Sequence, residues 1–163
     1  MATRENIFLQ SGSTAAEEAT LLAGLLGLEP IPDTSGAGPD EYGLRGPART
    51  VDGVLGFVIQ PNYHVEPDPE PEDVQAIDAY PIEIDIWLGR DEVAQAQEAR
   101  LVFDRLVQAR PQVPMLLCHE LGRLVAAYLP GRGVREFPAG TTMDAADAGQ
   151  WHGWVLDLAD QEK

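Results

Sequence analysis

The clearest pattern of apolar and polar positions lies in residues 82–88, where every second residue is Ile or Leu. Strict alternation predicts a strand whose apolar side chains share one face. The positions between them hold Glu83, Asp85 and Trp87, which we therefore expect on the opposite face.

A first helix is predicted to begin at a capping box formed by Thr14 and Glu17, because apolar residues recur at helical spacing after it. Gly27 and the prolines after it predict the end of this helix. Its apolar positions are Ala15, Leu22, Leu25 and Leu26.

A second helix is predicted over residues 92–110, with Asp91 as its N-cap and Pro111 after its end. Its expected apolar stripe consists of Val93, Ala99, Val102, Phe103, Leu106 and Val107.

Further strand candidates are short: residues 7–9, 42–48, 51–59 and 134–137. The segment 113–129 is ambiguous, because its apolar residues fit either a helix or two strands joined by a turn. We favour a hairpin of residues 115–120 and 124–129, since Gly122 is unfavourable inside a helix.

The order strand, helix, strand, strand occurs twice and predicts an α+β domain spanning residues 1–163. We expect a mainly antiparallel sheet with both helices packed on one face, and a tandem βαββ pseudo-repeat as its architecture. An acidic, Pro-rich connector over residues 64–79 joins the two halves. Alternating prolines favour an extended, solvated loop there.

The charge of the chain is strongly unbalanced, with 27 Asp and Glu against 11 Lys and Arg and a formal net charge of −16. Its densest acidic positions are Glu66, Asp68, Glu70, Glu72 and Asp73. Such a charge repels nucleic acid and anionic membranes and attracts basic proteins. We therefore expect a basic protein partner, no nucleic acid and no membrane.

Cellular context follows from a few compositional features. The one cysteine, Cys118, excludes an intrachain disulfide. The first ten residues lack the apolar run of a signal peptide, and no stretch has the length of a membrane span. Nearly all basic residues are Arg, as is typical of a GC-rich bacterial genome. We expect a cytoplasmic protein.

No motif of catalysis, metal binding or cofactor binding stands out. His119 and Glu120 begin a zinc-protease pattern, but Arg123 stands where the second histidine is required. Cys118 precedes His119 directly, so on a strand the two side chains point to opposite faces. No catalytic residue, metal ligand or cofactor is therefore assigned, and the protein is more consistent with a non-enzyme.

Two hypotheses for function remain open. The first is a non-enzymatic module that masks a basic partner surface, as an inhibitor or a toxin-neutralising immunity protein does, through the residues of the acidic connector together with Glu83, Asp85 and Trp87. The alternative is a small-molecule-binding or enzymatic domain with a pocket near His119, Glu120, Trp151 and Trp154.

Overall fold

The computed structural model describes residues 3–32, 40–89 and 91–155, which form one antiparallel sheet and three α-helices. The strands lie in the order β2-β3-β4-β5-β1-β6-β7-β8, and all their pairings are antiparallel. The predicted α+β class and mainly antiparallel sheet are confirmed. The tandem pseudo-repeat stays a prediction. The strands are β1 (Glu5–Leu9), β2 (Glu29–Pro30), β3 (Tyr42–Pro47), β4 (Val54–Pro61), β5 (Ile82–Trp87), β6 (Met115–His119), β7 (Arg123–Leu129) and β8 (Gly133–Glu136).

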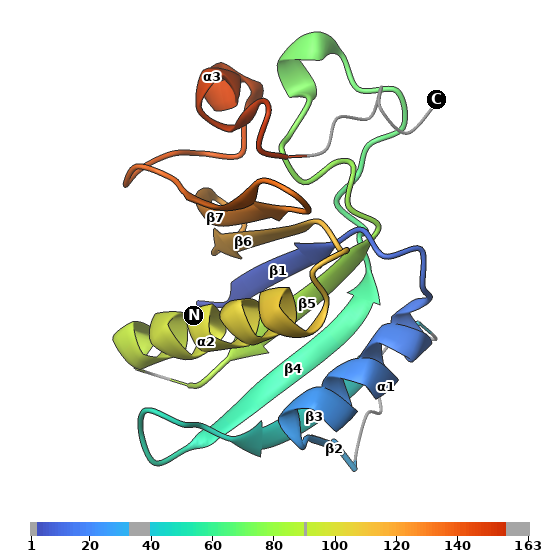
Figure 1. Cartoon of the computed structure of the whole chain (residues 1–163), viewed down its shortest axis with the longest axis vertical. Helices are drawn as coiled ribbons and strands as arrows, with labels where there is room; N and C mark the ends of the chain where they lie inside the picture. The colour runs from blue at the N-terminus through green and yellow to red at the C-terminus, as the bar shows by residue number, and fades with distance from the viewer. Residues whose placement is uncertain (1–2, 33–39, 90, 156–163) are drawn as a thin grey trace.

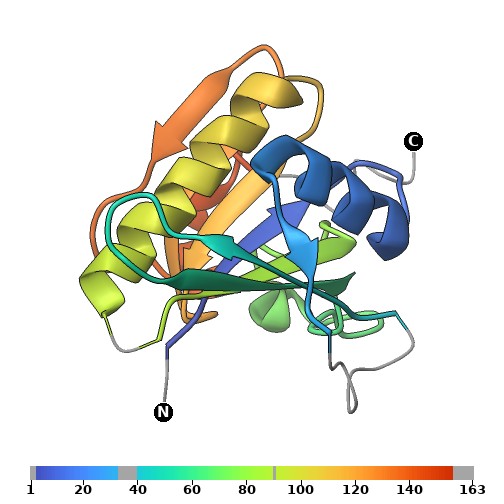
Figure 2. The same cartoon turned by 90° about the horizontal axis from the view of Figure 1, so that it is seen from below.

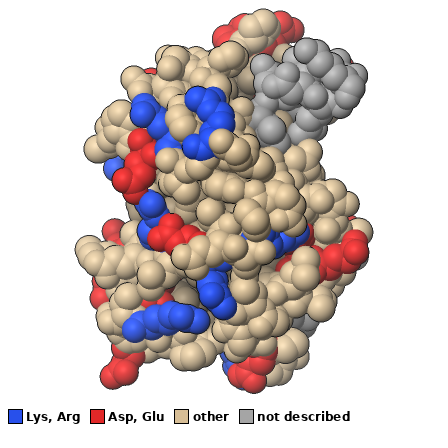
Figure 3. Space-filling model, viewed as in Figure 1, with Lys and Arg blue, Asp and Glu red and all other residues tan. Residues whose placement is uncertain are grey.

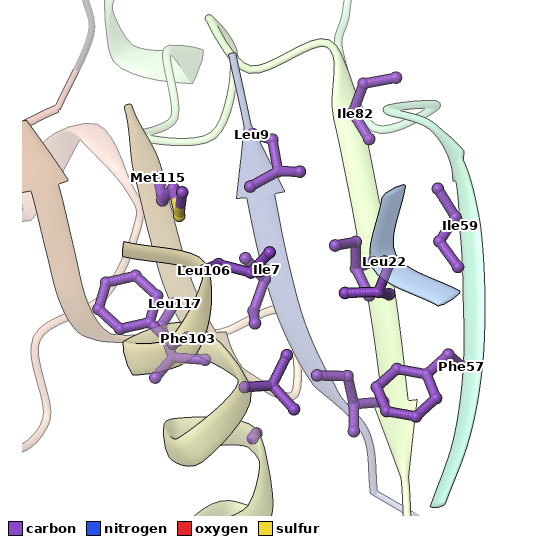
Figure 4. Close-up of a cluster of buried hydrophobic side chains, with 14 of the residues drawn as sticks. Ile7, Leu9, Leu22, Phe57, Ile59, Ile82, Phe103, Leu106, Met115 and Leu117 are labelled. Atoms are coloured by element: carbon purple, nitrogen blue, oxygen red, sulfur yellow. The ribbon is translucent and has the colours of Figure 1, made fainter. Parts of the chain in front are cut away.

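Helices α1 (Ala15–Leu26) and α2 (Glu92–Ala109) cover the same face of the sheet, as predicted (Figures 1 and 2). Thr14 and Glu17 form the expected capping box of α1, and Gly27 ends that helix with a positive φ of 68°. Figure 4 shows the core between the helices and the sheet. Its labelled members include Ile7 of β1, Phe57 of β4 and Phe103 of α2.

Helix α2 departs from its expected stripe. Val93 is 71% exposed and does not join the core, whereas Gln95 and Glu98 are buried. Both polar side chains bind backbone groups of other segments. Gln95 accepts a hydrogen bond from the Leu88 amide, and Glu98 accepts two from the loop after β3. Local apolar periodicity cannot reveal a buried polar group whose partners are distant in the chain.

The opposite face of the sheet is covered as well. Residues 74–80 pack there together with the C-terminal helix α3 (Ala148–Trp151) and the segment before it. Ile77 and Tyr80 are buried beside Phe8 of β1 and Trp151. The predicted solvated connector is therefore wrong for its second half, and only residues 64–73 form an exposed acidic segment. A short 3₁₀ turn, Pro71–Asp73, lies within that segment.

The ambiguous segment is a hairpin of β6 and β7, in agreement with the interpretation preferred from the sequence. Its turn is one residue earlier than expected. Glu120 and Leu121 occupy the central positions, both with φ of 55°. This left-handed conformation is unfavourable for residues other than Gly and Asn, so neighbouring contacts have to stabilise it.

Candidate functional site

Glu83, Asp85 and Trp87 lie on the face of β5 that points away from α1 and α2, since Ile82, Ile84 and Ile86 belong to the core under the helices. The alternation correctly places them on that face, but Glu83 does not reach the surface that the masking hypothesis assigns to it, because its side chain is 1% exposed. The alternation within β5 gave no indication that residues 74–80 and the C-terminal segment cover this face of the sheet.

Glu83 lies at the centre of a hydrogen-bond network between three segments of the chain. Its carboxylate accepts hydrogen bonds from Gln60 Nε2 at 2.7 Å and Asn6 Nδ2 at 3.2 Å, and lies 3.1 Å from His64 Nε2. Burial raises the pKa of Glu83, and the nearby charge of Asp85 adds to this effect. These contacts connect β1, β4 and β5, so Glu83 supports the surface from within.

The side chain of Asp85 is 13% exposed and thus less buried than that of Glu83. It accepts hydrogen bonds from Asn6 Nδ2 at 2.5 Å and from Arg4 at 3.3 Å. Asn6 in turn accepts a hydrogen bond from the Leu121 amide at 3.1 Å. The same network therefore stabilises the left-handed turn between β6 and β7.

Trp87 is half-buried and is not a freely presented anchor. The Arg4 guanidinium lies 4.8 Å from the centre of a Trp87 ring, within cation–π range. The ring also packs directly on Gly56 of β4, where an added Cβ would lie 2.2 Å from it. Gly56 is therefore needed to seat the ring against the sheet.

Residues 64–73, which we call the acidic loop, leave β4 at one end of the sheet and pass over the top of the molecule in Figure 1. Its five carboxylates are all exposed, and none is paired with a basic side chain among the residues that the structure describes: Glu66, Asp68, Glu70, Glu72 and Asp73. Three prolines within the loop restrict its backbone.

Beside this loop is a cavity of about 340 Å³, which we call the acidic hollow. Its charged or titratable lining residues are His64, Glu66, Glu72, Asp73, Asp78 and Asp144. Asp78 is buried and accepts a hydrogen bond from the Gln75 amide at 2.8 Å. Burial raises the pKa of Asp78, and the charge of Glu66 contributes. The hollow has the chemistry to receive a cationic side chain.

Sequence reasoning missed several residues of this region. Asn6 and Gln60 gave no signal, because single amides on strands are common. Asp78 and Asp144 are separated by 66 positions, and only the packing of the C-terminal segment against residues 74–80 brings them to one hollow. The Pro-rich composition indicated the acidic loop but not the C-terminal segment that carries Asp144.

His119 forms a second titratable pair, on the face of the sheet that carries α2. Its Nδ1 lies 2.6 Å from the carboxylate of Glu5, which is buried. Burial raises the pKa of Glu5, while the contact with His119 acts in the opposite direction. An apolar cavity of about 250 Å³ adjoins the pair.

The aromatic residues of the alternative hypothesis lie elsewhere. Trp151 is buried in the cluster on the opposite face of the sheet, with Trp154 packed against it. The hypothesis of one pocket shared by these aromatics with His119 and Glu120 is therefore wrong, because the sheet separates Trp151 from His119. Cys118 and His119 lie on opposite faces of the sheet, as their adjacent positions predicted. Cys118 is buried in the same cluster as Trp151, and burial strongly raises the pKa of its thiol.

Within residues 3–32, 40–89 and 91–155, no group of three or more His, Cys, Asp and Glu side chains is arranged to hold a metal ion. The helices of that part of the chain are also too short or too polar to cross a membrane. Comparisons with protein-family models, curated proteins and solved structures each found no match. Function must therefore be argued from the geometry of these residues.

Proposed function

We propose that this protein is a non-enzymatic binding module whose acidic loop and acidic hollow cover a basic surface of a partner protein. The main support for this proposal is that the five carboxylates of residues 66–73 are exposed and form no ion pair with a basic side chain among the described residues. Masking of a basic cleft in this way is how an inhibitor or a toxin-neutralising immunity protein would act.

The physical case rests on charge and on preorganisation. Clustered carboxylates repel one another, and a basic surface would relieve that repulsion on binding. Prolines at positions 67, 69 and 71 limit the conformational entropy that the loop loses when it binds. The acidic hollow offers a recess for one Arg or Lys side chain of the partner, where a charge-assisted hydrogen bond adds specificity.

Asp85 and Trp87 extend this proposed surface along β5, whereas Glu83 supports it from beneath. Trp87 lies about 13 Å along the strand from Glu83, judged from the rise per residue. A standard protein interface, about 800 Å² on each side, is large enough to span that distance. Residues beyond the acidic loop can therefore contribute to one continuous contact.

The test is capture of a partner from a lysate of the native host with three forms of the protein. The wild type is compared with Glu66→Gln/Glu72→Gln, which removes two charges from the hollow. The matched control, Asp52→Asn/Glu92→Gln, removes two exposed charges elsewhere. Each capture is done at about 0.05 M and about 0.5 M salt, on either side of physiological ionic strength.

We expect one basic protein to bind the wild type and the control at low salt, and to be lost from the hollow variant and at high salt. The captured protein is then purified and its binding reconstituted from the two pure components. Capture of no specific protein, or equal loss from the hollow variant and the control, would contradict the proposal.

A further inference from the structure

A second hollow lies on the helix-bearing face of the sheet, between the end of α1, the β3–β4 hairpin and α2. We call it the helix-side hollow. Its volume is about 410 Å³, within the range of small-molecule sites. Leu55, Phe57 and Val102 supply apolar lining and are almost fully buried, and Leu28 and Leu101 also line the hollow.

The carboxylates that line the hollow already have partners. Glu98 is 1% exposed, and its two oxygens accept hydrogen bonds from the amides of Arg49 at 2.7 Å and Thr50 at 2.8 Å. Asp104 pairs with Arg100 at 3.0 Å. Glu98 thereby fixes the loop that carries Arg49, so the edge of the hollow is held in place.

Two guanidinium groups at the hollow have no such partner. Arg49 and Arg105 both line it and are exposed, and neither side chain forms a hydrogen bond or ion pair with any residue that the structure describes. Four other arginines are paired with carboxylates: Arg4, Arg45, Arg100 and Arg110. Three described arginines outside the hollow also have no carboxylate partner among the described residues: Arg123, Arg132 and Arg135. Basic side chains are visible on this face in Figure 3. Free guanidinium groups are thus found beside apolar lining in a chain that is otherwise rich in acids.

We propose that the helix-side hollow binds an organic monocarboxylate with an apolar body, such as a medium-chain fatty acid. The guanidinium groups of Arg49 and Arg105 would bind the carboxylate through charge-assisted hydrogen bonds. The accessible apolar lining, Leu26, Leu28 and Leu101, would contact the hydrocarbon. A single negative charge suits this protein, because repulsion by a net charge of −16 grows with the charge of the ligand. The site is independent of the acidic loop.

The experiment titrates octanoate into ¹⁵N-labelled protein and follows amide chemical shifts, with 1-octanol as the neutral probe of equal chain length. Arg49→Gln and Arg105→Gln each remove one guanidinium from the hollow. Arg123→Gln is the matched control, since Arg123 is exposed and does not line the hollow. All three positions are on the surface, so folding should be retained.

We expect saturable shifts at residues of the hollow with octanoate, and about tenfold weaker binding in each of the two hollow variants, as expected when a charged hydrogen bond is lost. Octanoate should bind Arg123→Gln as it binds the wild type, and octanol should bind more weakly than octanoate. No saturable shift, equal weakening in all three variants, or equal binding of octanol would overturn the proposal. Shifts at the hollow that depend on protein concentration without octanoate would point to a second copy as occupant and would also overturn it.

Discussion

Replacement of Asn6 by Ala tests the structural role assigned to the carboxylates of β5. Asn6 is 2% exposed and takes part in three hydrogen bonds, with Glu83 at 3.2 Å, Asp85 at 2.5 Å and the Leu121 amide at 3.1 Å. Hydrogen bonds to charged groups contribute about 1.5 kcal/mol or more, and one to a backbone amide about 1 kcal/mol. We therefore expect Asn6→Ala to lower the free energy of unfolding by about 4 kcal/mol.

The assay is urea unfolding followed by circular dichroism, with the slope against denaturant checked for constancy. Gln112→Ala serves as the control, because Gln112 is exposed, and it should change stability by less than about 0.5 kcal/mol. Asn6→Asp sharpens the test. It retains the shape but puts a third carboxylate beside Glu83 and Asp85, so this variant should be least stable at neutral pH and recover as the pH falls.

Two results would refute this reasoning. A loss below about 1 kcal/mol in Asn6→Ala would show that water or neighbouring groups replace the three hydrogen bonds. An Asn6→Asp variant whose stability, relative to the wild type, does not change between pH 7 and pH 5 would show that the three carboxylates do not interact as the distances require.

Further predictions concern pH, packing and reactivity. Burial raises the pKa of three carboxyl groups: Glu5, Asp78 and Glu83. Because the folded state binds their protons more tightly than the unfolded state, the free energy of unfolding should increase as the pH falls from 7 to about 5 and decrease again as the pH rises through the folded pKa values. A flat or opposite dependence in urea titrations would contradict this. Gly56→Ala should displace the Trp87 ring, lower stability by about 1–3 kcal/mol and shift the tryptophan emission, whereas unchanged emission would argue against the close packing. Cys118 should react with a thiol reagent only after addition of denaturant, and prompt reaction of the folded protein would contradict its burial.

Local patterns in the sequence were sufficient to predict the alternation of β5 and the start of α1, but not the burial of Gln95 and Glu98 on α2. The alternation in residues 82–88 correctly placed Glu83, Asp85 and Trp87 on one face, and the capping box correctly began α1 at Thr14. These features depend on neighbours within a few positions, which the sequence displays directly.

The opposite side of the sheet could not be predicted in the same way. Its cover consists of residues 74–80 and the segment before α3, which are far apart in the chain and meet only in the folded state. Glu83 is enclosed by partners that are distant in the chain as well, namely Asn6, Gln60 and His64. Asp144 reaches the acidic hollow through the packing of the C-terminal segment. The acidic loop was visible from composition alone, because a solvated, charged segment needs no distant partner.

The most direct test of the central claim is the affinity of the purified basic partner for three forms of the protein, measured at equilibrium and low salt. We predict that Glu66→Gln/Glu72→Gln weakens binding by about tenfold or more, in line with the loss of charge-assisted contacts at the acidic hollow. The control Asp52→Asn/Glu92→Gln should stay within about twofold of the wild type, because surface charges outside the contact act only through a screened field. Equal affinities for the two variants would contradict the assignment of the acidic loop as the binding surface.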